Sequence, residues 1–533
     1  MSTAADITSN NPPAPPVWRP KFNPWAIAMT VTLATFMEVL DSSIANVALP
    51  HIAGNLSITQ DEATWVLSSY LVANAIVLPI SAWLSTKFGR KRFYMTCVVL
   101  FGISSLMCGL ATSLPMLVFF RVLQGLGGGG LAPTEQAILA DTFAPEKRGQ
   151  AFSVYAMAVV VAPVIGPTLG GFITDNFSWR WLFLINVPVA IVSLILSSRM
   201  LEDPPFLAEM RKKILTVDYL GLSLLAIGIG ALQVMLDKGE REDWFSSPFI
   251  VIFAVIAAVC LVSAVIWEYH HPHPVLDVRL LINRNFAVAC GMMFMLGASL
   301  YGATVLIPQL LQTLMGYTAM QAGMVLSPGG LVIIATMPLI GKYVGKVDAR
   351  WMIAFGFSAI ALSLFNMTNW YLDIDFKTAM MFRVYQAIGM GFLFIPIQTL
   401  CYVGIPREKN NNVSGMTNLA RNLGGSLGIS AISVIVSRRA QFHQGILAGH
   451  TSAFDPALQQ RMAGLVRTFE LKGFDHVTAL NMAHKMLYGG MERQAAMLGY
   501  IDAMVVFGVI AAVMVPAAFL MKKSIGGVAR GGH

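Results

Sequence analysis

Charged residues are scarce in this chain of 533 residues. Asp, Glu, Lys and Arg together make up 12% of the sequence, whereas hydrophobic residues make up 56%. Soluble domains carry roughly 25% charged residues. A chain with so little charge cannot cover the surface of a soluble protein of this length, so the composition predicts a membrane protein.

Cysteine is also rare, and no pair of cysteines has a spacing typical of metal ligands. Each cysteine lies within or at the end of an apolar segment, so buried free thiols are expected. The motif HHPHP at 270–274 is broken by prolines and does not predict a metal site. The five cysteines are Cys97, Cys108, Cys260, Cys290 and Cys401.

Nucleotide-binding motifs are missing in any suitable setting. The stretch GLGGGG at 125–130 formally fits GxGxxG, but no strand precedes it and no βαβ unit surrounds it. Glycines within an apolar helix are more typical of close helix packing or bending. The sequence therefore predicts no cofactor, no metal and no enzyme active site.

Fourteen apolar runs approach the ~20 residues that a helix needs to cross a bilayer. Backbone groups inside a bilayer must be hydrogen-bonded internally, so runs of this length are expected to be helices. The predicted fold class is an all-α membrane protein with 14 transmembrane helices. The predicted spans are 25–49, 65–85, 94–111, 115–140, 151–173, 181–198, 219–236, 248–267, 286–307, 322–341, 352–368, 378–403, 413–436 and 498–519.

Lys and Arg are concentrated in alternate loops. If the N-terminus is cytoplasmic, the short outside loops contain only Arg180, Lys238, Arg241 and Lys377. The positive-inside rule then predicts that both termini are cytoplasmic. The net charge of +8 is explained by this topology, so nucleic-acid binding is not expected.

One outside segment, 437–497, is unusually long and contains the helix-like pieces ALQQRMAGLVRTFEL and DHVTALNMAHKMLYGGMERQAAM. Two interpretations stay open. The segment is either an amphipathic flap at the membrane surface or a docking site for an extracytoplasmic partner.

An internal repeat indicates a duplicated unit. RVLQGLGGGGLAP at 121–133 recurs as RVYQAIGMGFLFIP at 383–396, and VLPISAWL at 77–84 resembles TMPLIGKY at 336–343. The spacing predicts two six-helix bundles separated by two extra helices, a 6 + 2 + 6 plan. The predicted parts are a disordered tail 1–24, bundles 25–200 and 281–521, a two-helix insertion with its loops 201–280, the extracytoplasmic loop 437–497 within the second bundle, and a C-terminal tail 522–533.

Several charged and neutral polar residues lie within the predicted spans, where they are costly and mark ion or substrate paths. Glu38 and Asp41 are three residues apart, on one face of the first helix. Two carboxylates so close in a low dielectric do not both ionise readily, and a nearby arginine would keep one charged. We expect Asp41 and Arg121 at the same depth. The predicted cavity residues are Gln124, Glu135, Gln309, Gln312, Arg383, Gln398, Asn418 and Arg421.

Such an arrangement can load and release a proton, with Asp41 as carrier, Glu38 tuning it and Arg121 responding to its charge. The alternative is a static Asp–Arg bridge that only fixes two helices.

Two further motifs have a structural and a functional interpretation. The fifth span is either an ordinary packed helix or a bendable gating helix. FGRKR at 88–92 is either a positive-inside signal alone or also a latch at the cytoplasmic face. The residues concerned are Pro163, Gly166, Pro167, Gly170 and Gly171 in the fifth span, and Gly89, Arg90 and Lys91 in the loop.

The motifs LDSSIANVALP, RVLQGLGGGG, APVIGPTLGGFITDNFSWRWLFLINVP and FGRKR resemble those of the major facilitator superfamily. More narrowly, the chain resembles the fourteen-span drug:proton antiporters and their EmrB-type inner-membrane exporters. The resemblance implies two six-helix domains that rock around a central cavity and export amphipathic or hydrophobic toxic compounds in exchange for protons. It maps the family's first-helix acid onto Asp41, its fourth-helix arginine onto Arg121, and its antiporter signature onto the fifth span.

The resemblance also implies partners. EmrB-type pumps of Gram-negative bacteria work with a periplasmic adaptor protein and an outer-membrane channel, and segment 437–497 is the expected contact for the adaptor. Two departures are visible. Thr86 stands where the family's loop motif has an acid, which puts a charge-based latch in doubt, and Glu38 and Glu135 are not general to the family.

The sequence thus predicts a multidrug efflux transporter of the bacterial inner membrane, with hydrophobic small molecules and protons as ligands. Rival hypotheses are a dedicated exporter of one metabolite such as a fatty acid or siderophore, a nutrient symporter, and a non-transporting sensor or scaffold.

Overall fold

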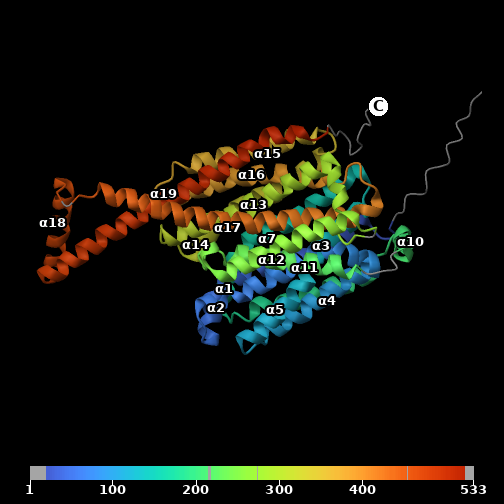
Figure 1. Cartoon of the computed structure of the whole chain (residues 1–533), viewed down its shortest axis with the longest axis horizontal. Coiled ribbons are helices and arrows are strands. Elements are labelled where there is room, and N and C mark those ends of the chain that lie inside the picture. Colours follow the sequence, from blue (N-terminus) through green and yellow to red (C-terminus); the bar gives the residue numbers. More distant parts are fainter. Residues whose placement is uncertain (1–19, 214–217, 273, 453, 523–533) are drawn as a thin grey trace, which may run out of the picture.

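The computed structural model describes residues 20–213, 218–272, 274–452 and 454–522. Within these ranges every regular element is a helix, and most helices run along one common axis (Figure 1). Short 3₁₀ turns join several of them, at Pro145–Lys147, Trp244–Ser246, Val278–Ile282, Arg407–Lys409 and Ala518–Leu520.

The helices follow the chain in three groups. The first group is α1 (Pro24–Leu56), α2 (Gln60–Ala63), α3 (Trp65–Phe88), α4 (Arg90–Gly109), α5 (Leu114–Gly128), α6 (Leu131–Thr142), α7 (Arg148–Asn176), α8 (Trp181–Leu184) and α9 (Asn186–Met200). The second is α10 (Pro205–Lys213), α11 (Tyr219–Lys238) and α12 (Pro248–His270). The third is α13 (Arg284–Thr313), α14 (Ala319–Tyr343), α15 (Ala349–Met367), α16 (Phe376–Cys401), α17 (Asn410–His450), α18 (Pro456–Leu471) and α19 (His476–Ala517).

The fourteen predicted spans are confirmed, because the described residues contain 14 helical segments long and apolar enough to cross a membrane. The fourth span is divided into α5 and α6 at Gly129 and Gly130. A Cβ atom on Gly125 or Gly129 would lie 2.4 Å from the carbonyl oxygen of Tyr70 or Asn74, respectively. These glycines therefore let the chain approach α3 closely, as the packing interpretation of GLGGGG predicts.

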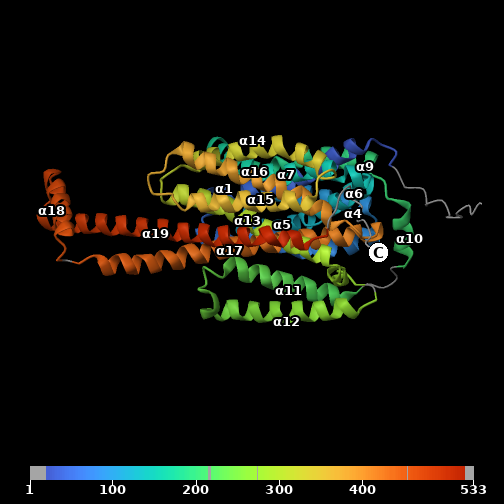
Figure 2. The same cartoon turned by 90° about the horizontal axis from the view of Figure 1, so that it is seen from above.

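The most extensive contacts between the first and third groups are made by two pairs of helices. Helix α7 packs on α14, and α3 packs on α17. The second group lies outside this core, where α11 packs on α3 and on α12, and α12 is outermost (Figure 2). The membrane-spanning helices thus follow one another along the chain in the order that the 6 + 2 + 6 plan predicts. The boundaries of the domains stay a prediction.

The last two long helices extend far beyond their predicted spans. Helix α17 has 41 residues and α19 has 42, so at 1.5 Å per residue each is about 60 Å long. Both project past the other helices at the end opposite to α10, and α18 lies across their tip (Figures 1 and 2). Residues 437–497, here called the projecting hairpin, therefore do not fold back as a flap against the ends of the other helices.

Candidate functional site

Asp41 lies at the centre of a buried polar site between α1, α5 and α9. Asp41 is 2% exposed. Arg121 Nη1 donates to Oδ2 at 2.6 Å, while Gln124 Nε2 and Asn186 Nδ2 donate to Oδ1 at 3.0 and 2.6 Å. Asp41 and Arg121 therefore meet, and Gln124, one of the predicted cavity residues, binds Asp41.

Arg121 is held rigidly on its other sides. Its Nε donates to the carbonyl oxygen of Val66 at 2.9 Å. The guanidinium carbon lies 4.3 Å from the ring centre of Tyr70 and 5.5 Å from that of Phe183, which are cation–π distances. The cation is thus positioned by α3 and α8 as well as by the acid.

Glu38 belongs to a different hydrogen-bond network from Asp41. It accepts from Tyr70 Oη at 2.8 Å and from Asn74 Nδ2 at 3.0 Å, both on α3. It also lines a cavity of about 100 Å³, together with Tyr301 of α13 and Arg421 of α17. Three residues along a helix leave two side chains only about 60° apart around the helix axis, yet Glu38 bonds to α3 while Asp41 bonds to α5 and α9. The two acids therefore have different hydrogen-bond partners, and their shared role as a proton site stays a prediction.

Neutral amides join the two repeats near the middle of the bundle. Gln398 Nε2 of α16 donates to Gln136 Oε1 of α6 at 2.7 Å, and Asn418 Nδ2 of α17 donates to the same oxygen at 2.8 Å. Arg421 Nη1 donates to Tyr155 Oη of α7 at 2.8 Å. The sequence reasoning missed Gln136 and Tyr155, although Gln136 precedes Gln398 by 262 positions, the offset of the internal repeat.

The remaining predicted cavity residues lie elsewhere. Glu135 is fully buried and accepts from Thr32 Oγ1 at 2.5 Å, so it faces α1 rather than the cavity. Gln309 and Gln312 are exposed near the end of α13 and do not join the central amides. These placements correct the prediction, because an apolar helix pattern does not reveal which neighbour each polar side chain faces. Arg383 is buried on α16.

Helix α7, which carries the Gly/Pro-rich motif, packs on α1 through its smallest residues. A Cβ atom on Gly166 would lie 2.3 Å from Ser43 Oγ, and one on Gly170 would lie 3.2 Å from a methyl group of Ile44. Gly171 has open space. The predicted small face against a neighbouring helix is therefore present, and the neighbour is the helix that carries Asp41.

The FGRKR motif is mostly helical rather than a loop, since Gly89 with φ +93° separates α3 from α4 and Arg90 begins α4. Arg90 is 2% exposed. It forms an ion pair with Asp141 of α6, and its Nε donates to Asn411 Oδ1 of α17 at 2.7 Å. Asn410 Nδ2 donates to Asp141 Oδ1 at 2.6 Å. The motif thus forms a clasp between the two repeats.

Thr86 participates in this clasp without a charge. Its Oγ1 accepts from Asn411 Nδ2 at 2.9 Å. Lys91 Nζ, in contrast, donates to the carbonyl oxygen of Ser198 at 2.6 Å within the first group. The clasp therefore combines one buried ion pair with neutral amide and hydroxyl groups.

Comparison with known proteins agrees with this architecture. The sequence profile of the Major Facilitator Superfamily matches residues 31–429. The probable multidrug resistance protein EmrY of Escherichia coli K12 is 41% identical over 81% of this chain and 84% of its own length. The multidrug export protein EmrB of the same strain is 37% identical over 83% and 86%.

A third relative, the fatty acid resistance protein FarB of Neisseria gonorrhoeae, is 34% identical over 95% of this chain and 97% of its own length. Among solved structures, the human organic anion transporter MFSD10 aligns over 92% of this chain and 100% of its own, with a TM-score of 0.57 and 12% identity. That likeness concerns the fold alone. The chain is a multi-pass membrane protein that belongs to the major facilitator superfamily, a family of transporters rather than enzymes, and is closely related to EmrB and EmrY.

Proposed function

We propose that this protein exports amphipathic or hydrophobic toxic compounds across the bacterial inner membrane in exchange for protons, by alternating access. The names of EmrY and EmrB, a resistance protein and an export protein for multiple drugs, support the substrate class. The observation that carries the proton coupling is the buried Asp41 carboxylate with its three donors.

Protonation of Asp41 would act on the packing of α1. The neutral acid keeps an acceptor for Arg121 but loses the attraction between opposite charges, and it accepts more weakly from Gln124 and Asn186, so α1 is less firmly tied to α5 and α9. Helix α1 also contacts α7 at Ser43 and Gly166.

Helix α7 in turn packs on α14 of the other repeat, where a Cβ atom on Gly330 would lie 2.9 Å from a methyl group of Val164. A change in charge at Asp41 can therefore act through packed contacts, from α1 to α7 and from α7 to α14. The contact of α7 with α14 belongs to the interface between the two repeats, which changes when they rock. One proton that moves down a potential of 100 mV supplies about 2.3 kcal/mol for this motion.

The cavity beside Glu38 is the proposed substrate site. It carries one acid, Glu38, and one base, Arg421, on opposite repeats, with the aromatic side chains of Tyr70 and Tyr301 between them. Aromatic rings attract cations and apolar groups alike. Such a cavity suits amphipathic molecules of either charge, and its position between the repeats lets substrate binding respond to their motion.

The clasp around Arg90 is proposed to close the cytoplasmic end. It joins α4 and α6 to the start of α17 through Asp141, Asn410 and Asn411. Opening toward the cytoplasm must break these bonds. With both termini cytoplasmic, the projecting hairpin then faces the periplasm.

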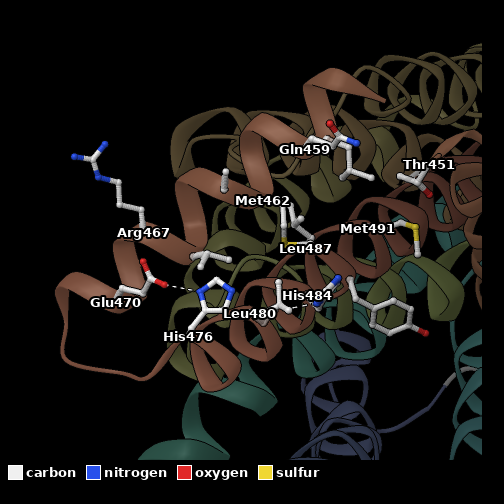
Figure 3. A pocket seen from close by; sticks show the side chains of 14 residues that line it. Thr451, Gln459, Met462, Arg467, Glu470, His476, Leu480, His484, Leu487 and Met491 are labelled. Atoms are coloured by element: carbon white, nitrogen blue, oxygen red, sulfur yellow. Dashed lines mark hydrogen bonds and ion pairs between the residues drawn. The ribbon is translucent and has the colours of Figure 1, made fainter. Parts of the chain in front are cut away.

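The projecting hairpin is proposed to bind a helical segment of a periplasmic adaptor, which in turn reaches an outer-membrane channel. Between α18 and α19 lies an open pocket of about 910 Å³ lined by Met462, Leu480 and Leu487, with Glu470 and His476 paired at 2.7 Å on its rim (Figure 3). Nearby, Phe454 is 88% and Leu471 82% exposed. Apolar side chains held this far from the bundle suit a protein partner, and an apolar groove between helices suits a helix.

A second candidate function is the export of one class of metabolite, which the likeness to FarB favours because that relative is named for fatty acid resistance. Resistance profiling of a deletion strain decides between the two. Sensitivity to several unrelated compounds supports multidrug export, and sensitivity to fatty acids alone supports the dedicated exporter.

The proposed function is tested in vesicles that contain the purified protein, with a panel of lipophilic cations and weak acids. An acidic compartment on the side of the projecting hairpin should drive substrate toward that side. If no compound moves under this gradient, the protein is not a proton-driven pump.

A further inference from the structure

The two repeats contain the same arginine–glutamine pair in different surroundings. In the first repeat the pair is Arg121 and Gln124, and in the second it is Arg383 and Gln386, 262 positions later in both cases. In the first repeat the pair binds one carboxylate by both oxygens: Arg121 donates to Oδ2 of Asp41 and Gln124 donates to Oδ1. The protein itself thus shows which ligand this pair of donors fits.

In the second repeat no acid among the described residues bonds to the same donors. Arg383 is 1% exposed and Gln386 is fully buried. Arg383 Nη1 donates to Gln386 Oε1 at 2.6 Å. Among the described residues, Arg383 Nε and Gln386 Nε2 have no hydrogen-bond partner. Gln386 Nε2 is the repeat counterpart of the atom with which Gln124 holds Asp41.

The internal repeat shows which residue of the second repeat stands at the position of Asp41. The motif NVALP at 46–50 corresponds to TVLIP at 304–308, which sets Ser299 of α13 at the place of Asp41. Ser299 is buried, and α13 packs on α16. By the second repeat motif, Gly329 takes the place of Tyr70. A Cβ atom on Gly329 would lie 3.2 Å from Arg383 Cγ, so no aromatic ring occupies that side of the arginine stem.

A buried guanidinium without a counter-charge is costly in a membrane interior, and such residues mark binding sites. Arginine binds carboxylates with charge-assisted hydrogen bonds, and a carboxamide N–H can complete the contact to the second oxygen. We propose that Arg383 and Gln386 form an anion-recognition site that binds the carboxylate of an amphipathic acid substrate, in the manner in which Arg121 and Gln124 bind Asp41.

This inference rests on the proposed export function and names a substrate class for it. Because Arg383 is 1% exposed here, the ligand reaches it in another conformation of the transport cycle. Bound there, the carboxylate supplies to the second repeat the charge that Asp41 supplies to the first.

The test uses the full-length protein in detergent with two fluorescent probes, dansyl-aminoundecanoic acid and its methyl ester, which differ only in the carboxylate. The variants are Arg383→Gln, which removes the cation, and Ser299→Asp, which supplies an acid to Arg383 from within the protein. We expect each variant to raise the dissociation constant of the acid about tenfold or more. Binding of the ester should change less than twofold. Uptake of tetraphenylphosphonium into vesicles serves as a control for transport and folding.

The inference would be overturned by acid affinity within twofold of the wild type in both variants, or by equal weakening of acid and ester. Absence of acid binding by the wild type would overturn it too. Failure of the proposed export function is distinguishable, because it abolishes gradient-driven tetraphenylphosphonium uptake by the wild type regardless of the carboxylate probe. Ser299→Asp keeps the test decisive if Arg383→Gln does not fold.

Discussion

Gln398 donates a hydrogen bond of 2.7 Å to Gln136, and the two residues are separated by 262 positions, the offset of the internal repeat. Residues that are equivalent in a repeat can touch each other only near the axis that relates the two copies. The contact therefore marks the axis between the two repeats, in the middle of the bundle. Asn418 adds a second bond to the same Gln136 oxygen at 2.8 Å.

The two repeats differ most where chemistry is expected. The first repeat holds the acids Glu38, Asp41 and Glu135 on α1 and α6. Their counterparts in the second repeat are apolar or neutral, as Ser299 illustrates, while Arg383 is retained. The duplication thus supplies the scaffold, and the departures from it place buried acids in the first half and leave the buried Arg383 in the second.

Replacing Asp41 with Asn should abolish proton-coupled export while the protein still folds. Asn keeps a hydrogen-bond acceptor for Arg121 but cannot change its charge, so it mimics the protonated state permanently. Proton release driven by substrate in vesicles should fall to background. Glu62→Gln is the matched control, because Glu62 is an exposed acid near α1 that bonds only Thr59. Normal gradient-driven transport by Asp41→Asn would remove Asp41 from the mechanism.

Replacing Glu38 with Gln should alter substrate preference rather than coupling. Gln can keep contacts with Tyr70 and Asn74 but removes the negative charge from the cavity that Arg421 shares. We expect the KM for a lipophilic cation to rise about tenfold, equivalent to about 1.4 kcal/mol, while the number of protons exchanged per substrate is unchanged. Side-by-side measurement of cation uptake and proton flux checks both. A loss of proton flux with any substrate would assign Glu38 to the proton path instead.

Much of this architecture could be predicted from the sequence because the length and the composition of an apolar segment identify a membrane helix. The fourteen spans, and the meeting of Asp41 with Arg121, followed from apolar runs and from depth along two helices. The repeat offset could also have identified Gln136 from Gln398. Asn186 was missed because it is neutral and stands among apolar residues in the motif INVP.

Other features depend on helix rotation and helix length, which the pattern of spans does not reveal. Glu38 and Asp41 share a stretch of helix but face different neighbours. Gln124 was placed in the cavity, yet it binds Asp41. The sequence does not predict that the projecting hairpin consists of two continuous helices. The apolar stretch of each span ends at the membrane boundary, whereas the backbone hydrogen bonds of α17 and α19 continue beyond it.

Adding a single methyl group at Gly166 should produce a steric clash between α7 and α1. The new Cβ atom would lie 2.3 Å from Ser43 Oγ and 2.6 Å from Ser43 Cβ. Overpacking of this kind costs about 1–3 kcal/mol, so Gly166→Ala should lower both the melting temperature and the transport rate. Gly171→Ala is the matched control on the same helix, because nothing lies within 4 Å of its Cβ position.

A compensating change separates the local clash from a general effect of the alanine. Ser43→Gly removes both atoms that collide, so the double variant should recover transport relative to Gly166→Ala. If Gly171→Ala impairs transport as much as Gly166→Ala does, the close contact with α1 is not what matters.

Removing the projecting hairpin should leave transport by the helix bundle intact but prevent binding of the adaptor. Helices α17 and α19 touch at the base of the hairpin, where a Cβ atom on Gly499 would lie 2.7 Å from the Val436 carbonyl oxygen and 3.0 Å from Ala440 N. A short glycine linker can therefore replace residues 440–495 without pulling the bundle apart. We expect whole-cell resistance to be lost while vesicle transport stays within about twofold of the wild type, because only the whole cell needs a route across the outer membrane.

A pair of point variants tests whether the pocket itself binds the partner. Leu487 lines the pocket, whereas its neighbour Met486 does not and is 59% exposed. Leu487→Lys places a charge among apolar side chains and should reduce resistance and adaptor capture, while Met486→Lys should leave both unchanged. Equal effects of the two variants, or loss of vesicle transport in the deletion, would mean that the hairpin serves folding or transport rather than docking. Retained resistance in the deletion strain would show that export does not require an adaptor at this site.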